Sequence, residues 1–568
     1  MLNRAKVFFL ILLLSAFSVI TAVYIYNRYS IFLEEDYLSN SLSAVKIYDD
    51  IKTENLNKYN PQNQKALDVL LYKINLELFP EEKKISGDVT IRAVVLDTSI
   101  KNIVLNLYDN MIIRELKVNK QNVNYIQKDR NLEISPGFFL DDTIDVRIIY
   151  SGTPEKKGFG SFNFDTASAK PFIYTLNEPV YASTWFPCID LPDDKALAEI
   201  NIKADSALTT VSNGKLINIK KEGAKSTYQW KTVYPISTYL ITFITGNLKF
   251  FGEKYYSASG DSLQLSYYAL PANLENAKRD FADHKKYLKV FEELFSPYPF
   301  VHEKYGVAEF LWQYGAMENQ TITGIGSNFI TGRKFFTDML IHELAHHWWG
   351  NSVGPKTWKD IWLNEGFATY SEALYWEKES GISALKSTMR SKKGDFASGT
   401  LYNPQISLFS NMIYNKGAWV LHMLRKEMGS VKFFELLKEY YKTFAYKNAD
   451  TYDLKKMAEK ISGQKLDYFF HQWVFKGEGI IDIEYNWNLE AKGKSFFVQL
   501  NINQLQNGYD IYKFPVEIKF IFDDGTDSIE QVSIDSRKSS FIFALNKKPV
   551  EVVLDPEMWL LAKIKFSN

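Results

Sequence analysis

The sequence predicts a multidomain α+β protein with an N-terminal β domain, a mainly helical central domain and a small C-terminal β-sandwich. The chain has 568 residues, which is too long for a single hydrophobic core. Runs with a period of two, such as "YKINLELFP" from Tyr72, continue to about residue 250 and return after residue 480. Between about 270 and 475 the apolar residues follow a helical period, as in "ENAKRDFADHKKYLKVFEELF".

An apolar stretch opens the chain. Residues 7–26 carry no charged side chain, and as a helix they would extend about 30 Å, the thickness of the hydrocarbon core of a membrane. Basic residues precede the stretch, which favours a cytoplasmic N-terminus. We expect residues 1–29 to form a cytoplasmic tip and a single transmembrane anchor, with the other domains outside the cytoplasm. A cleaved signal peptide with its cleavage site at residues 16–18 is the alternative, and it would give a secreted or periplasmic protein.

The rest of the chain divides where the hydrophobic period changes. Residues 30–65 are polar and mixed, which is typical of a stalk or linker. An N-terminal β domain is expected at 66–250, a mainly helical central domain at 251–478 and a C-terminal β-sandwich at 479–568. No internal repeat interrupts this order.

Charge and cysteine content exclude some classes of protein. Lys plus Arg and Asp plus Glu number 67 each, so the formal net charge is zero. A general nucleic-acid-binding protein would need a basic excess, so we expect no nucleic-acid partner. Cys188 is the only cysteine, which excludes an intramolecular disulfide and a cysteine metal cluster. We expect it to be a buried apolar residue and not a nucleophile.

The most informative stretch is "IHELAHHWWG" at residues 341–350. His342 and His346 stand four residues apart, so a helix places both imidazoles on one face, where they can bind one Zn²⁺. Glu343 would lie beside the metal, where it can take a proton from a water molecule that the metal activates. We expect Thr337 to cap this helix. Two histidines on a polar helix face, without a metal, are the alternative.

A third ligand comes from Glu365, which is separated from His346 by eighteen residues. We expect it in the first turn of a second helix with Asn364 as its N-cap. Catalytic zinc uses three protein ligands and keeps a fourth position open, and this pattern supplies the three. Asp360 is a candidate to orient a ligand histidine, with a surface-loop aspartate as the alternative. His347 points away from His346 on a helix, so we expect it to pack or to support the site from outside.

These residues resemble the gluzincin zinc peptidases, with their pattern HExxH-x18-E, and the stretch "YGAMENQ" narrows the resemblance. It is similar to the exopeptidase motif of the zinc aminopeptidases that include aminopeptidase N and leukotriene hydrolase. The resemblance implies a substrate-binding segment made of Gly315, Ala316, Met317, Glu318 and Asn319. In it, Glu318 would pair with the free α-amine, and Gly315 and Ala316 would bind the substrate backbone along an edge strand.

Two further stretches carry the same resemblance. The segment "YNKGA" at 414–418 resembles the family segment with the catalytic tyrosine, so Tyr414 would donate to the oxyanion of the reaction. The stretch "FPCIDLP" at 186–192 resembles a family motif, but Leu191 stands where the family often has a glutamate. Counted back from this stretch, Glu178 stands where the resemblance implies a second residue that binds the substrate amine. An exposed carboxylate at a strand end is the alternative.

The resemblance covers about residues 70 to 568. It implies a saddle-like N-terminal β domain, a thermolysin-like α/β catalytic domain and a small β-sandwich. Many relatives continue into a C-terminal helical domain that covers the active site. This sequence ends at Asn568 without such a domain, so we expect a more open site or one that another subunit covers.

Together these interpretations predict one Zn²⁺ per chain on His342, His346 and Glu365, with Glu343 as the base and Tyr414 as the oxyanion donor. The expected activity is removal of the N-terminal residue from peptides that have a free amine. The alternatives are an endopeptidase on the same scaffold, another hydrolase such as an epoxide hydrolase, and an inactive membrane-anchored binding protein.

Overall fold

The computed structural model describes residues 62–137, 142–405 and 407–567. The predicted membrane anchor at 7–26 and nearly all of the predicted stalk lie outside these residues. Among the helices of the described ranges, none has the length and apolar content needed to cross a membrane. The described residues belong to one compact unit, so the domain limits at residues 250 and 478 stay predictions.

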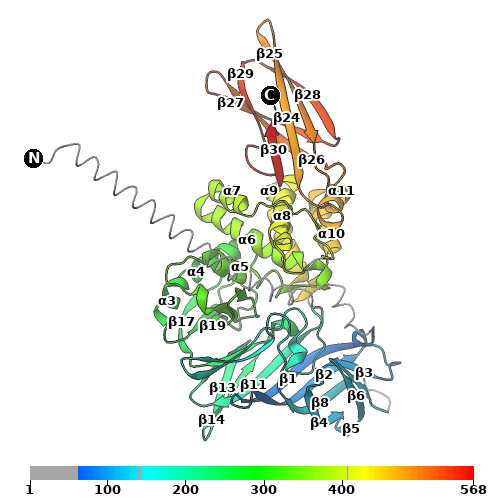
Figure 1. Cartoon of the computed structure of the whole chain (residues 1–568), viewed down its shortest axis with the longest axis vertical. Helices are drawn as coiled ribbons and strands as arrows, with labels where there is room; N and C mark the ends of the chain where they lie inside the picture. The colour runs from blue at the N-terminus through cyan, green and yellow to red at the C-terminus, as the bar shows by residue number, and fades with distance from the viewer. Residues whose placement is uncertain (1–61, 138–141, 406, 568) are drawn as a thin grey trace, which may run out of the picture. The chain divides into compact units, whose positions relative to one another are not determined.

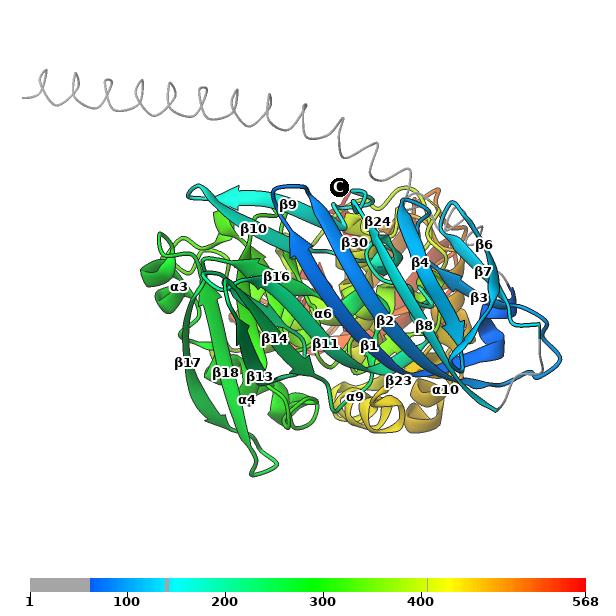
Figure 2. The same ribbon diagram turned by 90° about the horizontal axis from the view of Figure 1, so that it is seen from below.

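A nine-stranded sheet dominates the N-terminal part, and Figure 2 shows it as a broad layer of strands. Its order is β13-β14-β11-β1-β2-β8-β4-β5, with β15 paired to β11. Strand β1 (Leu67–Phe79) runs parallel to β11 (Lys195–Asp205) and antiparallel to β2 (Lys84–Val95). Buried residues alternate with more exposed ones along β1, as the period of two predicts. The other members are β4 (Met111–Val118), β5 (Gln121–Asn122), β8 (Thr143–Gly152), β13 (Lys215–Glu222), β14 (Lys225–Lys231) and β15 (Ile236–Ser237).

Two smaller sheets complete this part. One has the order β12-β16-β10-β9, and the other has the order β3-β7-β6. Glu178 follows β10 (Lys170–Thr175), so the first of these sheets positions it. The remaining strands are β3 (Ile103–Asn106), β6 (Asn124–Lys128), β7 (Asn131–Ser135), β9 (Phe162–Ala167), β12 (Thr209–Ser212) and β16 (Phe243–Gly246).

The central part combines a five-stranded sheet with helices, which confirms the predicted change of period. The sheet has the order β17-β18-β19-β21-β20, so β20 (Ala316–Met317) lies at its edge. Its other strands are β17 (Lys249–Tyr256), β18 (Ser262–Ala269), β19 (Tyr305–Phe310) and β21 (Thr323–Gly326). The helices are α3 (Leu274–Asp280), α4 (His284–Leu294), α5 (Thr337–Ala345), α6 (Trp362–Ser380), α7 (Ile382–Ser391), α8 (Gly417–Met428), α9 (Ser430–Phe444), α10 (Thr451–Ser462) and α11 (Asp467–Phe470), and they lie between the N-terminal and C-terminal strands in Figure 1.

Both predicted helix caps are wrong. Helix α5 begins at Thr337 itself, and the Thr337 hydroxyl donates to the carbonyl of Lys334 instead of accepting from the first turn. Helix α6 begins at Trp362, because a 3₁₀ turn at Trp358–Asp360 already leads into it. Asn364 therefore lies inside the helix.

The C-terminal strands form two sheets, as the sequence predicts. One has the order β28-β25-β24-β30 and the other β27-β26-β29. Phe520 and Phe543 pack against each other from different sheets, with ring centroids 5.1 Å apart. The Tyr485 hydroxyl also donates to the carbonyl of Val552 across the two sheets, so they form a sandwich. The strands are β24 (Ile481–Lys492), β25 (Ser495–Gln504), β26 (Phe514–Phe522), β27 (Asp527–Ile534), β28 (Lys538–Leu545), β29 (Pro549–Leu554) and β30 (Ala562–Phe566).

Helices α6 and α8 cross with backbone against backbone. Gly366 of α6 faces Gly417 at the start of α8, and a Cβ added at Gly417 would lie 2.9 Å from the Cα of Gly366. The two backbones can approach so closely only because both positions are glycine. The crossing sets the distance between Glu365, next to Gly366, and the π-helical turn Met412–Lys416 that precedes α8.

We predict that Gly417→Val destabilises the protein by about 2 kcal/mol, because the added side chain would overpack this crossing. The measurement is urea unfolding followed by circular dichroism. Glu435→Ala, on an exposed position of α9, is the control and should change the free energy of unfolding by less than about 0.5 kcal/mol. Equal unfolding curves for Gly417→Val and the unmodified chain would contradict the close crossing.

Candidate metal centre

Helix α5 and its C-cap residue present two histidines to a single point. His342 and His346 are both buried, and their Nε2 atoms lie 3.0 Å apart. The Nδ1 atom of His342 lies 2.9 Å from a carboxylate oxygen of Glu372, and that of His346 lies 3.0 Å from the carbonyl oxygen of Trp349. Since each Nδ1 faces an acceptor, it carries the ring proton, and each Nε2 presents a lone pair.

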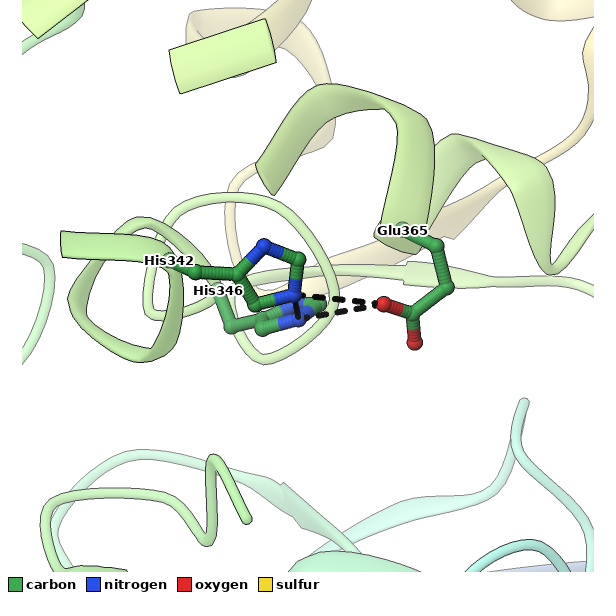
Figure 3. A group of neighbouring side chains, drawn as sticks. All are labelled: His342, His346 and Glu365. Carbon is green, nitrogen blue, oxygen red and sulfur yellow. Dashed lines mark hydrogen bonds and ion pairs between the residues drawn. The ribbon is translucent and has the colours of Figure 1, made fainter. Parts of the chain in front are cut away.

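Glu365 completes this donor set from α6. One of its carboxylate oxygens lies 3.4 Å from the Nε2 of His342 and 3.4 Å from the Nε2 of His346, as Figure 3 shows. When each ring holds a single proton on Nδ1, these three atoms present only electron pairs to one point, and a cation satisfies all three. Two imidazole nitrogens and one carboxylate oxygen are the ligands of catalytic zinc, and they therefore fit a zinc ion.

The local electrostatics also favour a cation. Burial would lower the pKa of His342, but hydrogen bonds to Glu365 and Glu372 raise it to about 10. Burial would raise the pKa of Glu365, but the imidazoles of His346 and His342 hold it at about 2. The two histidines are therefore most stable with a positive charge beside the ionised carboxylate of Glu365.

Glu343 lies on the same helix and is buried, with one carboxylate oxygen free of hydrogen bonds among the described residues. Burial raises its pKa to about 8, although His342 and His346 act in the opposite direction. A carboxyl group with a pKa in this range can take a proton and give it back near neutral pH.

Two more carboxylates face the donor set. Glu178, Glu318 and Glu365 each have a carboxylate oxygen within 4.8 Å of the others, and all three are buried. Burial and the neighbouring Glu318 raise the pKa of Glu178 well above its usual value, and burial is also the main cause of the raised pKa of Glu318. One oxygen of Glu178 and one of Glu318 accept no hydrogen bond from any described residue. A positively charged group between them would relieve both the repulsion and the missing hydrogen bonds.

The segment before Glu318 forms an open sheet edge. Ala316 and Met317 make up β20, which pairs with β21 on one side only. Gly315 accepts a hydrogen bond from the backbone of Gly326, which holds the segment in place. Asn319 is buried, and its side-chain amide makes no hydrogen bond with described residues. An extended peptide could therefore pair with β20 and reach the carboxylates.

Tyr414 lies beside His342 of the donor set. Its ring stacks on His342 with centroids 5.9 Å apart and planes at 22°. It belongs to the π-helical turn Met412–Lys416 before α8. Burial, followed by the charge of Glu365, raises the pKa of Tyr414 well above its usual value, so the hydroxyl keeps its proton and can donate it.

The residue that orients a ligand histidine is Glu372, which the sequence reasoning missed. It follows Glu365 by seven residues, two turns of α6, so both carboxylates lie on the face toward α5. That spacing could have identified it. The proposal for Asp360 is wrong, because its carboxylate accepts bonds from the backbone and hydroxyl of Thr451 and holds the start of α10.

Two other residues, His347 and Tyr239, lie next to the site. His347 turns away from the donor set, and its Nδ1 lies 2.8 Å from the hydroxyl of Tyr298. Tyr239, another residue that the sequence reasoning missed, lies near the carboxylates, since burial and then Glu318 raise its pKa. Cys188 is buried, as predicted.

Comparison with known proteins agrees with this geometry. The family model described as "Peptidase family M1 domain" matches residues 280–473, and the family model described as "Peptidase M1 N-terminal domain" matches residues 69–240. The chain is 28% identical over 404 residues to leucine aminopeptidase 2 of Yarrowia lipolytica, covering 65% of this chain and 60% of that protein. It is 26% identical over 414 residues to leucyl aminopeptidase of Saccharolobus solfataricus, covering 67% of this chain and 50% of that protein. The chain thus spans less than two thirds of these relatives.

Solved structures show the same fold. Legionella pneumophila aminopeptidase A in complex with aspartic acid superposes with a TM-score of 0.78 at 18% identity, covering 89% of this chain and 60% of that chain. An M1 zinc metallopeptidase from Deinococcus radiodurans superposes with a TM-score of 0.63 at 26% identity, covering 72% of this chain and 93% of that chain. The two family matches together span more than half of the sequence and include every residue of the donor set, so the chain belongs to peptidase family M1 and its metal is zinc.

Proposed function

We propose that the chain is a zinc aminopeptidase that removes the N-terminal residue from peptides with a free α-amine. The observation that carries this proposal is the pair of buried carboxylates, Glu178 and Glu318, beside the histidine–histidine–glutamate donor set. The donor set alone would suit many hydrolases. The pair adds a binding site for one positive charge at a fixed distance from the metal. The aminopeptidase names of the relatives support the same conclusion.

In the proposed mechanism, His342, His346 and Glu365 hold zinc, which when bound acts as a Lewis acid on water and on the substrate carbonyl. Glu343 takes the proton of the attacking water and returns it to the leaving amine. Its buried position keeps this proton from exchanging freely with solvent.

The other residues bind and orient the substrate. Glu318 and Glu178 hold the α-ammonium, while Gly315 and Ala316 pair with the substrate backbone, and Met317 and Asn319 fix that segment from within. The hydroxyl of Tyr414 donates a hydrogen bond to the oxyanion that develops on the carbonyl. Such a donor contributes only when it is already placed before the reaction, and the stacking of Tyr414 on His342 supports this role.

The location of the protein rests on the sequence. We propose that residues 7–26 anchor the protein in a membrane with residues 66–568 outside the cytoplasm; signal cleavage and release is the alternative. Cell fractionation with an antibody against the catalytic part separates the two, because only the anchored form stays with the membrane after a carbonate wash.

An endopeptidase on the same scaffold is the second candidate. It would be favoured by the open edge of β20, which can take an extended chain of any length. Two carboxylates that must be neutralised argue against it, because an internal peptide segment brings no ammonium group.

Metal removal is the first test. We predict that a zinc chelator abolishes hydrolysis of aminoacyl p-nitroanilides and that equimolar Zn²⁺ restores it, because the ligand atoms of His342, His346 and Glu365 converge on one point. Metal analysis should find one zinc per chain. Activity that persists in the metal-free protein would exclude the proposal.

Loss of the base is the second test. Glu343→Gln keeps the size of the side chain but cannot accept the proton, so we expect kcat to fall by roughly 10²–10⁴-fold while zinc content is unchanged. Asp338→Asn, on the first turn of the same helix, is the control and should retain activity. A Glu343→Gln variant with normal turnover would contradict the assigned role.

The amine anchor is the third test. We expect N-acetylated peptides to be poor substrates, and we expect Glu318→Gln and Glu178→Gln each to raise KM for free-amine substrates by roughly 10-fold or more, as loss of a charge-assisted hydrogen bond predicts. The ratio of kcat/KM for free and acetylated peptides is measured. If the ratio is the same in the variants and the unmodified chain, the anchor is wrong, and cleavage of acetylated peptides would favour the endopeptidase.

A further inference from the structure

The carboxylate of Glu372 joins the candidate metal centre to a lysine outside it. One oxygen of Glu372 lies 2.9 Å from the Nδ1 of His342, and the other accepts a hydrogen bond of 2.6 Å from the Nζ of Lys392. His342 belongs to α5, Glu372 to α6, and Lys392 is the C-cap residue directly after α7. The contact is shielded, since the side chains of Glu372 and Lys392 are only 9% and 12% exposed.

Lys392 also has a special place in the charge balance. Five buried carboxylates gather here, those of Glu178, Glu318, Glu343, Glu365 and Glu372. Within the part of the chain that the structure describes, Lys392 is the only lysine or arginine that forms an ion pair with any of them. Lys392 therefore contributes a positive charge that belongs to the protein itself and does not depend on a bound ion or substrate.

Removal of Lys392 would leave one oxygen of the buried Glu372 without a partner. A buried carboxylate in that state rotates toward another donor. This rotation weakens its hold on the Nδ1 proton of His342. The imidazole would then lose the hydrogen bond that fixes its tautomer and its orientation, and outer partners of this kind matter for metal affinity.

We propose that Lys392 is a positioning residue for the metal, because it fixes the Glu372 carboxylate so that His342 presents the lone pair of Nε2 to zinc. This inference rests on the proposed metal site. It adds to that site a chain of contacts from His342 through Glu372 to Lys392. Lys392 itself would contact neither the metal nor the substrate.

The experiment is zinc affinity, measured by competition with a chelator. We expect Lys392→Met to weaken zinc binding by roughly 10-fold, the lower end of what such partners contribute. Lys386→Met is the matched control, since Lys386 lies on α7 and forms an ion pair of the same 2.6 Å length, with Glu557. It should change zinc affinity less than about two-fold. Lys392→Arg keeps the charge and should restore most of the affinity.

A second arm tests the route through Glu372. In a Glu372→Gln background, Lys392→Met should cause little further loss of zinc affinity, because the link is already broken. The absorption spectrum of the cobalt-substituted protein should change in Lys392→Met and not in Lys386→Met. If Lys392→Met does not fold, Lys392→Gln is measured in the same way, with a smaller loss expected.

The inference is overturned if the Lys392 variants bind zinc as tightly as the unmodified chain, or if the losses from Lys392→Met and Glu372→Gln simply add. Failure of the metal site itself is distinguishable, because zinc binding to the unmodified chain would then be insensitive to His342→Ala.

Discussion

Two imidazole nitrogens that point lone pairs at each other across 3.0 Å are the constraint on which the centre of this protein depends. Water cannot separate them at that distance, and Glu372 and the carbonyl of Trp349 hold the Nδ1 protons on the far sides of the rings. A cation satisfies this arrangement. The surrounding fold keeps the rings in place against their mutual repulsion, and it does so with buried hydrogen bonds, which are costly to break.

The fold meets that requirement with helices from different stretches of the chain. Helix α5 and its C-cap residue supply both rings, while α6 supplies Glu365 toward the metal and Glu372 behind it. The contact of Gly366 with Gly417 lets the segment of Tyr414 come close to α6. The N-terminal strands contribute Glu178 through the loop that follows β10. Lys195 of β11 ties them to α5 by donating to the carbonyls of Asn351 and Ser352, which follow that helix.

How much of this could be predicted depends on whether the signal is local. The spacing of His342 and His346 on a helix is a local property, and the structure brings them together with Glu365 as predicted. Helix starts were predicted less well. Capping rules placed them at Thr337 and Asn364, but tertiary contacts carry the chain into α5 and α6 in other ways. A capping side chain contributes only about 0.5–2 kcal/mol, and tertiary contacts override it at these two helices.

Partners distant in the sequence were the least predictable. Tyr239 reaches the site through the packing of the N-terminal strands, and no motif near it indicates this. Asp360 has the charge and the position expected of a residue that orients a histidine, yet it holds the start of α10 instead. Which of two nearby carboxylates faces a histidine depends on the rotation of α6, and the spacing from Glu365 to Glu372 carries that information.

The unpaired side of β20 has a consequence for the form in which a substrate can arrive. A strand edge recognises main-chain N–H and C=O groups, so the incoming chain must expose its own for several residues. A terminus that is wound into a helix, or already paired in a sheet of its own, has none to offer. Under the proposed function, folded proteins would be processed only as far as their ends fray, and the resistance of a target would reflect its local unfolding more than its side chains.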